Sequence, residues 1–101
     1  MDIEISTVSG QASMRLSGRF DYTTRNQFMS EADRILAQAE APEIRIDMGN
    51  LEYIDSSALG MLLMLRDKAK KHDKTIALHN ARGYVRQVID TAQFERLFTV
   101  A

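Results

Sequence analysis

The chain has 101 residues, of which 45% are apolar, and a formal net charge of −1 from 13 basic and 14 acidic side chains. A chain of this length buries about 60–65% of its unfolded surface, so we expect one domain spanning residues 1–101. Because cysteine is absent, neither a disulfide framework nor a thiolate metal site is possible. The near-neutral charge removes the long-range attraction that draws basic proteins to nucleic acids and anionic membranes.

No targeting or membrane-spanning segment is recognisable in the sequence. The N-terminus lacks the basic and apolar regions of a signal peptide. The longest apolar stretch that tolerates one glycine, 58–65, is too short to cross a bilayer. We therefore expect a cytoplasmic protein that binds neither nucleic acid nor membrane and that is a monomer when free.

The first elements in chain order are two short strands. Polar and apolar residues alternate over 2–6 and again over 13–17, and a turn of glycine-containing composition lies between them at 9–11. Two alternating runs joined by such a turn predict a β-hairpin.

A helix is predicted next, because the spacing of apolar residues changes. From Phe28 to Ala39 they recur at helical spacing, and either Thr23 or Thr24 can cap the start of this helix. Pro42 ends it, since the residue before a proline avoids the helical conformation.

The middle of the chain repeats the strand-then-helix pattern. Residues 43–48 alternate strictly, and Gly49-Asn50 is expected to end that strand. A second helix is predicted over 56–72, and residues 75–79 form another short strand.

The C-terminal third predicts a third helix and a short edge strand. Asn80 is a candidate cap for a helix carrying Val85 and Ile89, and the tail from Phe94 to Val100 suits a last helical turn and an edge strand. The order β-β-α-β-α-β-α predicts an α/β fold. We expect a mixed sheet of four to five strands with an N-terminal hairpin and three to four helices.

Three short oxygen-bearing side chains, Asp55, Ser56 and Ser57, stand together where the second helix begins. There the first backbone N–H groups lack partners and the helix dipole is positive. Asp55 or Ser56 can serve as the N-cap, which contributes about 1 kcal/mol. One cap needs only one side chain, so three candidates in a row indicate an additional role.

The start of the second helix is apolar on every side over 61–65. Either its first turns are wholly buried, or Met61 with Met64 or Leu65 forms an exposed patch beside the serines. Methionine-rich surfaces adapt well to protein partners, so Leu59, Met61 and Met64 are the candidate partner contacts. A phosphate beside such a patch would add about −1.5 to −2 charges and oppose docking.

The run from Tyr53 to Gly60, Tyr-Ile-Asp-Ser-Ser-Ala-Leu-Gly, resembles the phosphorylation motif of STAS domains, specifically of the single-domain bacterial anti-sigma factor antagonists. Their pattern is an apolar pair, then Asp-Ser-Ser/Thr-Gly/Ala-Leu-Gly at the start of the second helix. The segments 18–21, 44–48 and 74–78 resemble the family's segment before the first helix and two of its strands. One departure is Ala58, where the best-known members have glycine.

The resemblance implies that Ser56 is the phosphoacceptor, that Asp55 and Ser57 shape the acceptor loop, and that Asp21 lies near the partner-facing surface. It also implies a cycle of partner switching. The unmodified protein would bind an anti-sigma factor and release a sigma factor. A serine kinase, often the anti-sigma factor itself, would phosphorylate Ser56, and a PP2C-type phosphatase would restore binding. The chain would then be no enzyme and hold no cofactor, because ATP belongs to the kinase.

Alternative interpretations differ in how well the residues support them. One keeps the fold without the switch, as a constitutive non-enzymatic STAS subunit of a stress-sensing or transport complex. A hydrolase would need one of the two serines to meet His72 or His79, and Gly-x-Ser-x-Gly is absent. Neither histidine has metal-ligand spacing to a partner, so no metal site is predicted. The basic run 66–74 is interpreted as a solvated helix end that complements the dipole.

Overall fold

The structure, a computed structural model, describes residues 1–8 and 10–101. Ser9, in the turn predicted between the first two strands, lies outside the described residues. The elements in chain order are β1 (Asp2–Val8), β2 (Gln11–Phe20), the 3-10 turn η1 (Tyr22–Thr24), α1 (Arg25–Gln38), β3 (Glu43–Ile54), α2 (Ser56–Lys71), β4 (Thr75–His79), α3 (Gly83–Thr91), the 3-10 turn η2 (Phe94–Arg96) and β5 (Thr99–Val100).

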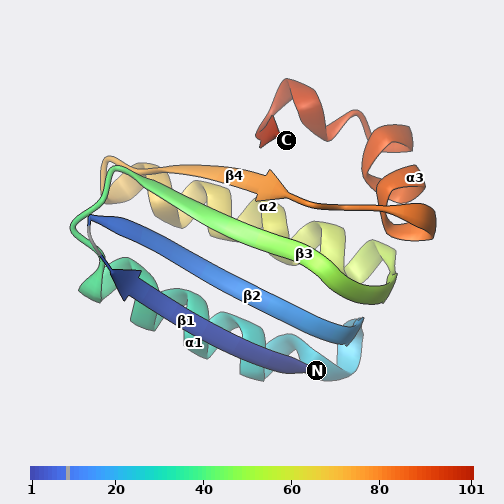
Figure 1. Ribbon diagram of the computed structural model, residues 1–101, viewed down its shortest axis with the longest axis horizontal. Coiled ribbons are helices and arrows are strands. Elements are labelled where there is room, and N and C mark those ends of the chain that lie inside the picture. Colours follow the sequence, from blue (N-terminus) through green and yellow to red (C-terminus); the bar gives the residue numbers. More distant parts are fainter. Residues whose placement is uncertain (9) are drawn as a thin grey trace.

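The strands form one mixed sheet in the order β1-β2-β3-β4-β5. β1 and β2 are antiparallel, as a hairpin requires, and the three remaining pairs are parallel. In Figure 1 α1 and α2 lie side by side behind the sheet, and α3 stands near its β4 side. The α/β fold predicted from the sequence, with its mixed sheet and N-terminal hairpin, is confirmed.

The core fills the space between the sheet and the two long helices. Alternate strand residues face the helices because successive side chains of a strand point to opposite faces, whereas helix residues do so every three or four positions. The fully buried side chains of this interface include Met14, Leu16, Phe28, Ile35, Ile44, Ile46, Met48, Leu62 and Leu65. Within residues 1–8 and 10–101, no helix is both long and apolar enough for a membrane span.

Two predictions about where elements begin and end are wrong. β3 does not stop at Gly49-Asn50 but continues to Ile54, because β2 remains paired with it as far as Phe20. Asn80 does not cap α3: its backbone has a φ of 63° and its side-chain amide donates to Asp47 at 3.2 Å instead. The residue that precedes α3 is Arg82, which forms no side-chain cap.

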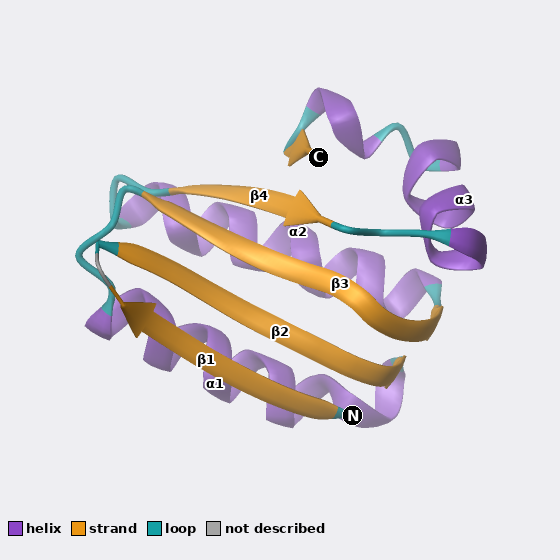
Figure 2. Ribbon diagram, in the orientation of Figure 1, coloured by secondary structure: helices purple, strands orange, loops and turns teal. Residues whose placement is uncertain are grey.

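The extra length of β2 and β3 positions the segment that carries the two serines. Because the two strands are parallel, their carboxyl ends meet at one end of the molecule, where η1 and the start of α2 follow directly. Figure 2 shows this end on the right, with α3 beside it. The segment that carries the two serines therefore lies at the carboxyl ends of β2 and β3.

Candidate functional site

The first turn of α2 is capped by Asp55. Its backbone is extended (φ −117°, ψ −178°), and its carboxylate accepts a hydrogen bond from the Ala58 N–H at 2.9 Å. The Asp55 N–H donates to the Phe20 carbonyl at 3.3 Å, which ties the loop to the end of β2. Of the two residues that the sequence offered as N-cap, Asp55 therefore takes that position.

Ser56 is the first residue of α2, and it is exposed, whereas Ser57 beside it is half-buried. Because Asp55 already accepts from the first turn, the hydroxyl of Ser56 is not required for capping. The first turn of α2 also contains no acidic side chain. A helix N-terminus with free N–H groups and a positive dipole end can accommodate a phosphate.

Asp21 lies at the same edge of the molecule as Asp55 and Ser56. Phe20 and Ile54, the last residues of β2 and β3, are paired in register. Asp21 and Asp55 follow these two residues directly. The structure thus brings together two carboxylates that are 34 positions apart in the chain (55 − 21).

Local hydrogen bonds fix the Asp21 carboxylate. One oxygen, Oδ1, accepts from the Thr23 hydroxyl at 2.6 Å and from the Thr23 N–H at 3.0 Å. The Arg19 Nε lies 3.7 Å from the other oxygen, Oδ2. The hydroxyl bond from Thr23 is the main cause that lowers the pKa of Asp21 below its ordinary value, and Arg19 acts in the same direction. A negative charge is thus held beside Asp55, Ser56 and Ser57, the serine loop.

The three predicted apolar contacts lie in different environments. Met61 is 1% exposed and belongs to the core-facing stripe of α2, so the prediction that its side chain contacts a partner is wrong. Helical periodicity explains this, because position 61 shares a face with Ala58 and Leu65. Leu59 is half-buried, and Met64 is 36% exposed with its sulfur 3.8 Å from the Arg25 guanidinium nitrogens.

An aromatic and cationic stack beside the serine loop was not predicted from the sequence. The Arg19 guanidinium carbon lies 4.1 Å from the centroid of the Tyr53 ring. The Tyr53 and Tyr84 rings are stacked, with centroids 5.8 Å apart and planes 13° apart. Tyr84 is 52% exposed. Tyrosine and arginine are enriched at the centres of protein interfaces, so this stack extends the candidate contact surface.

A shallow depression of about 410 Å³ lies between α2 and α3, next to the stack. Its lining is mainly apolar and contains Leu59, Tyr84, Gln87, Val88, Thr91 and Ala92. Leu59 thus connects the serine loop to α3. This depression could not be predicted from the sequence, because it forms only when α3 packs beside the start of α2.

The structure does not bring the serines and histidines together. His72 follows the last residue of α2, at the opposite end of that helix from Ser56, which is about 24 Å away at the usual helical rise. His79 pairs with Asp47 in the middle of β3, seven residues before that strand ends (54 − 47). The catalytic triad that could be written from the sequence is therefore not assembled at this site.

Comparison with known proteins places the chain in a family. A family model described as "Mlab, STAS domain" matches residues 3–99. The chain belongs to the STAS-domain family. This confirms the family indicated by the Asp-Ser-Ser run. A STAS-domain containing protein of Pseudomonas aeruginosa is similar to it, with 34% identity over 91 residues that cover 90% of this chain and 88% of that protein.

Anti-sigma factor antagonists are also among the proteins similar to this STAS domain. An anti-sigma F factor antagonist of Paenibacillus polymyxa is 30% identical over 63 residues, which cover 62% of this chain and 54% of that protein. The solved structure of the anti-sigma factor antagonist SpoIIAA in its unphosphorylated form matches with a TM-score of 0.81 and 20% identity. That match covers 99% of this chain and 88% of the SpoIIAA chain, and it shows that the two share the STAS fold.

Proposed function

We propose that this STAS domain is an anti-sigma factor antagonist that changes partners through phosphorylation of Ser56. In the unmodified state it binds an anti-sigma factor that is also a serine kinase, and a sigma factor is released. Phosphorylation of Ser56 ends the complex, and a PP2C-type phosphatase restores it. The observation that carries the proposal is the 2.9 Å hydrogen bond that the Ala58 N–H donates to the Asp55 carboxylate. It caps the helix, so the exposed Ser56 hydroxyl is not needed for the fold.

The mechanism follows from the charges around Ser56. A phosphate adds about −1.5 to −2 charges at neutral pH, and the helix N-terminus stabilises it, so the fold need not rearrange. Asp55 and Asp21 already supply negative charge at this edge. Docking a partner over Leu59 and Met64 would then require desolvating the phosphate, and this cost opposes binding.

The test compares baits that differ only at position 56. Ser56→Ala and Ser56→Asp baits are incubated with native lysate, and captured proteins are quantified by mass spectrometry. We expect a kinase of the GHKL type, or a regulator that contains such a domain, on the alanine bait and not on the aspartate bait. Ser6→Asp, which adds the same charge to an exposed residue of β1, is the matched control and should retain the partner.

A second candidate function is a constitutive subunit of a larger complex. The observation in its favour is the contact surface around Tyr84 and Leu59, which needs no modification to bind a partner. Equal capture of the same partners by the Ser56→Ala and Ser56→Asp baits would support this function and contradict the switch.

A further inference from the structure

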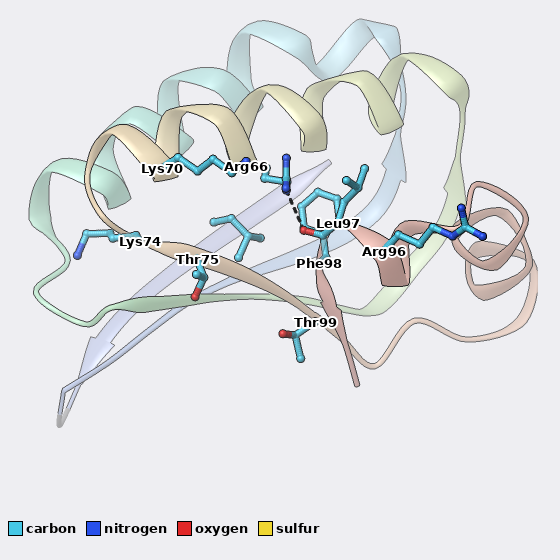
Figure 3. Close-up of a pocket in the computed structure, with 9 residues that line it drawn as sticks. Arg66, Lys70, Lys74, Thr75, Arg96, Leu97, Phe98 and Thr99 are labelled. Atoms are coloured by element: carbon cyan, nitrogen blue, oxygen red, sulfur yellow. Dashed lines mark hydrogen bonds between the residues drawn. The ribbon is translucent and has the colours of Figure 1, made fainter.

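A cleft lined by basic side chains lies at the other end of α2 from Ser56. It has a volume of about 300 Å³ and is bounded by the second half of α2, the start of β4 and the segment that leads into β5 (Figure 3). Its four cationic residues are Arg66, Lys70, Lys74 and Arg96, and none of the described residues that line it is acidic. The cleft thus concentrates positive charge on a protein whose net charge is −1.

Two of these cations are held by backbone carbonyl groups. Arg66 Nε donates to the Leu97 carbonyl at 2.8 Å, and Lys74 Nζ donates to the Ala41 carbonyl at 2.7 Å. Asp67 approaches Arg66 from outside the cleft, with 4.0 Å between Oδ1 and Nη1. These contacts fix the walls of the cleft but leave most of its charge unneutralised.

Lys70 and Arg96 supply the available charge. Both residues are exposed, and the ion pairs found within residues 1–8 and 10–101 include neither of them. Figure 3 shows Lys70 extending along α2 toward Arg66, while Arg96 lies on the opposite side of the cleft with its guanidinium directed away from Lys70. Both side chains are long and exposed, so a ligand with two separated negative charges could contact both.

The floor of the cleft contains an open sheet edge. β5 is two residues long and pairs with Ala77 and Leu78 of β4. Thr75 and Ile76 pair with β3 on one side, and among the described residues no strand pairs with them on the other. An unpaired edge of this kind can accept an extended peptide through main-chain hydrogen bonds.

We propose that this cleft binds an acidic, extended segment of a partner protein along the open edge of β4. The carboxylates of the segment would meet Lys70 and Arg96, and its apolar side chains would contact Leu97, which is 41% exposed. The sheet edge favours a peptide over a nucleic acid, which would need a longer basic track.

This site is separate from the surface at Ser56. Arg66 lies ten positions after Ser56 in α2 (66 − 56), which is about 15 Å along the helix. An acidic segment can therefore bind while the surface near Ser56 is occupied. The proposal does not depend on the phosphorylation switch, and each can fail without the other.

The test is a titration of the ¹⁵N-labelled protein with the peptide acetyl-Glu-Val-Asp-Val-Glu-Val-Asp-amide, followed by NMR. We expect saturable shifts of the amide signals of 75–77 and 97–99, slower hydrogen exchange at Ile76, and weaker binding as salt is added. Lys70→Glu combined with Arg96→Glu should weaken binding about tenfold, because two exposed attractions become repulsions. Lys71→Glu combined with Arg34→Glu, which reverses two exposed charges outside the cleft, should bind like the unaltered protein.

Three further probes decide whether the ligand class is correct. The Gln/Asn version of the peptide should not bind. If inorganic phosphate alone gives the same shifts and displaces the peptide, the cleft is a simple anion site and the proposal is wrong. Preferential binding of an oligouridylate, or shifts that map outside the cleft, would equally overturn it.

Discussion

At the scale of single residues, Asp55 and Ser56 divide two tasks that the sequence allowed either of them to perform. The aspartate, extended and half-buried, accepts from Ala58 and begins the helix. The serine takes the first helical position, where its side chain is exposed. A group that is to gain and lose a phosphate is best placed where the fold does not depend on it.

The cap assignment predicts unequal effects of substitution at these neighbours. Asp55→Ala should lower the free energy of unfolding by about 1 kcal/mol, because the Ala58 N–H loses its acceptor. Ser56→Ala should change it by less than half of that, since alanine is well suited to a helix interior. Urea denaturation of both variants, with Asp55→Asn as the variant that retains an acceptor, checks this. An equal loss for Ser56→Ala would return the cap to the serine.

Asp21 predicts a pH dependence of stability. Its pKa is lowered in the folded protein from an ordinary value of 3.8, chiefly by the Thr23 hydroxyl. A carboxylate with a lowered pKa stabilises the fold above its unfolded pKa, and this contribution is lost as the pH falls through the folded pKa. The difference in unfolding free energy between the unaltered protein and Asp21→Asn should therefore shrink as the pH falls below 3.8.

The measurement is urea denaturation of Asp21→Asn at several pH values. Asp47→Asn is measured alongside it, because Asp47 is a second carboxyl group with a lowered pKa. Burial raises the pKa of Asp47, but hydrogen bonds from Gly49 and Asn80 outweigh this effect and the pKa is lowered. Asp21→Asn and Asp47→Asn should therefore both converge on the unaltered protein in acid. A difference for Asp21→Asn that stays constant with pH would show that its charge is not coupled to folding.

At the scale of elements, α2 shows how one apolar run serves two surfaces. The sequence alone left open whether residues 61–65 are buried on all sides or form a patch. In the structure Met61, Leu62 and Leu65 are buried between α2 and the sheet, and Met64 is at the surface. The packing of α2 against α1 and the sheet decides that Met61 is buried and Met64 is exposed.

Substitution of the two methionines should separate these surfaces. Met61→Ala should lower the free energy of unfolding by about 2–5 kcal/mol, because it leaves a cavity in the core. Met64→Ala should cost less than about 1 kcal/mol, as expected of a surface position, and should weaken partner capture if the proposed surface is correct. Thermal and urea unfolding measure the first two values. Similar losses of stability for the two variants would contradict the assignment of their faces.

The Tyr53–Tyr84 stack should couple the end of β3 to α3. A double-mutant cycle with Tyr53→Ala and Tyr84→Ala should give a coupling energy of about 0.5 kcal/mol, the lower end for aromatic pairs because Tyr84 is exposed. Tyr22, which is 71% exposed, supplies the control pair with Tyr53, for which we expect additive effects. A Tyr53–Tyr84 coupling indistinguishable from that of the control pair would mean that the stack contributes nothing to α3 docking.

At the scale of the whole molecule, local patterns predicted the elements, but contacts between distant segments decided their limits. Alternation and helical spacing predicted the order of strands and helices correctly. They missed the continuation of β3 beyond Gly49, because pairing with β2 overrides the local tendency of Gly-Asn to turn. The Asp-Ser-Ser run could be recognised from the sequence because its three residues are contiguous. The stack of Arg19, Tyr53 and Tyr84 spans 65 positions (84 − 19) and left no contiguous signal.

The cap held by Asp55 has a consequence for how such a protein can evolve. Since the helix start is secured one residue earlier, the proposed control by a kinase can change through substitutions at position 56 while the chain stays folded. Under the proposed switch, replacing the serine by alanine or aspartate would give a permanently active or permanently silent copy while the scaffold stays intact. After gene duplication, regulation and architecture are then free to diverge separately.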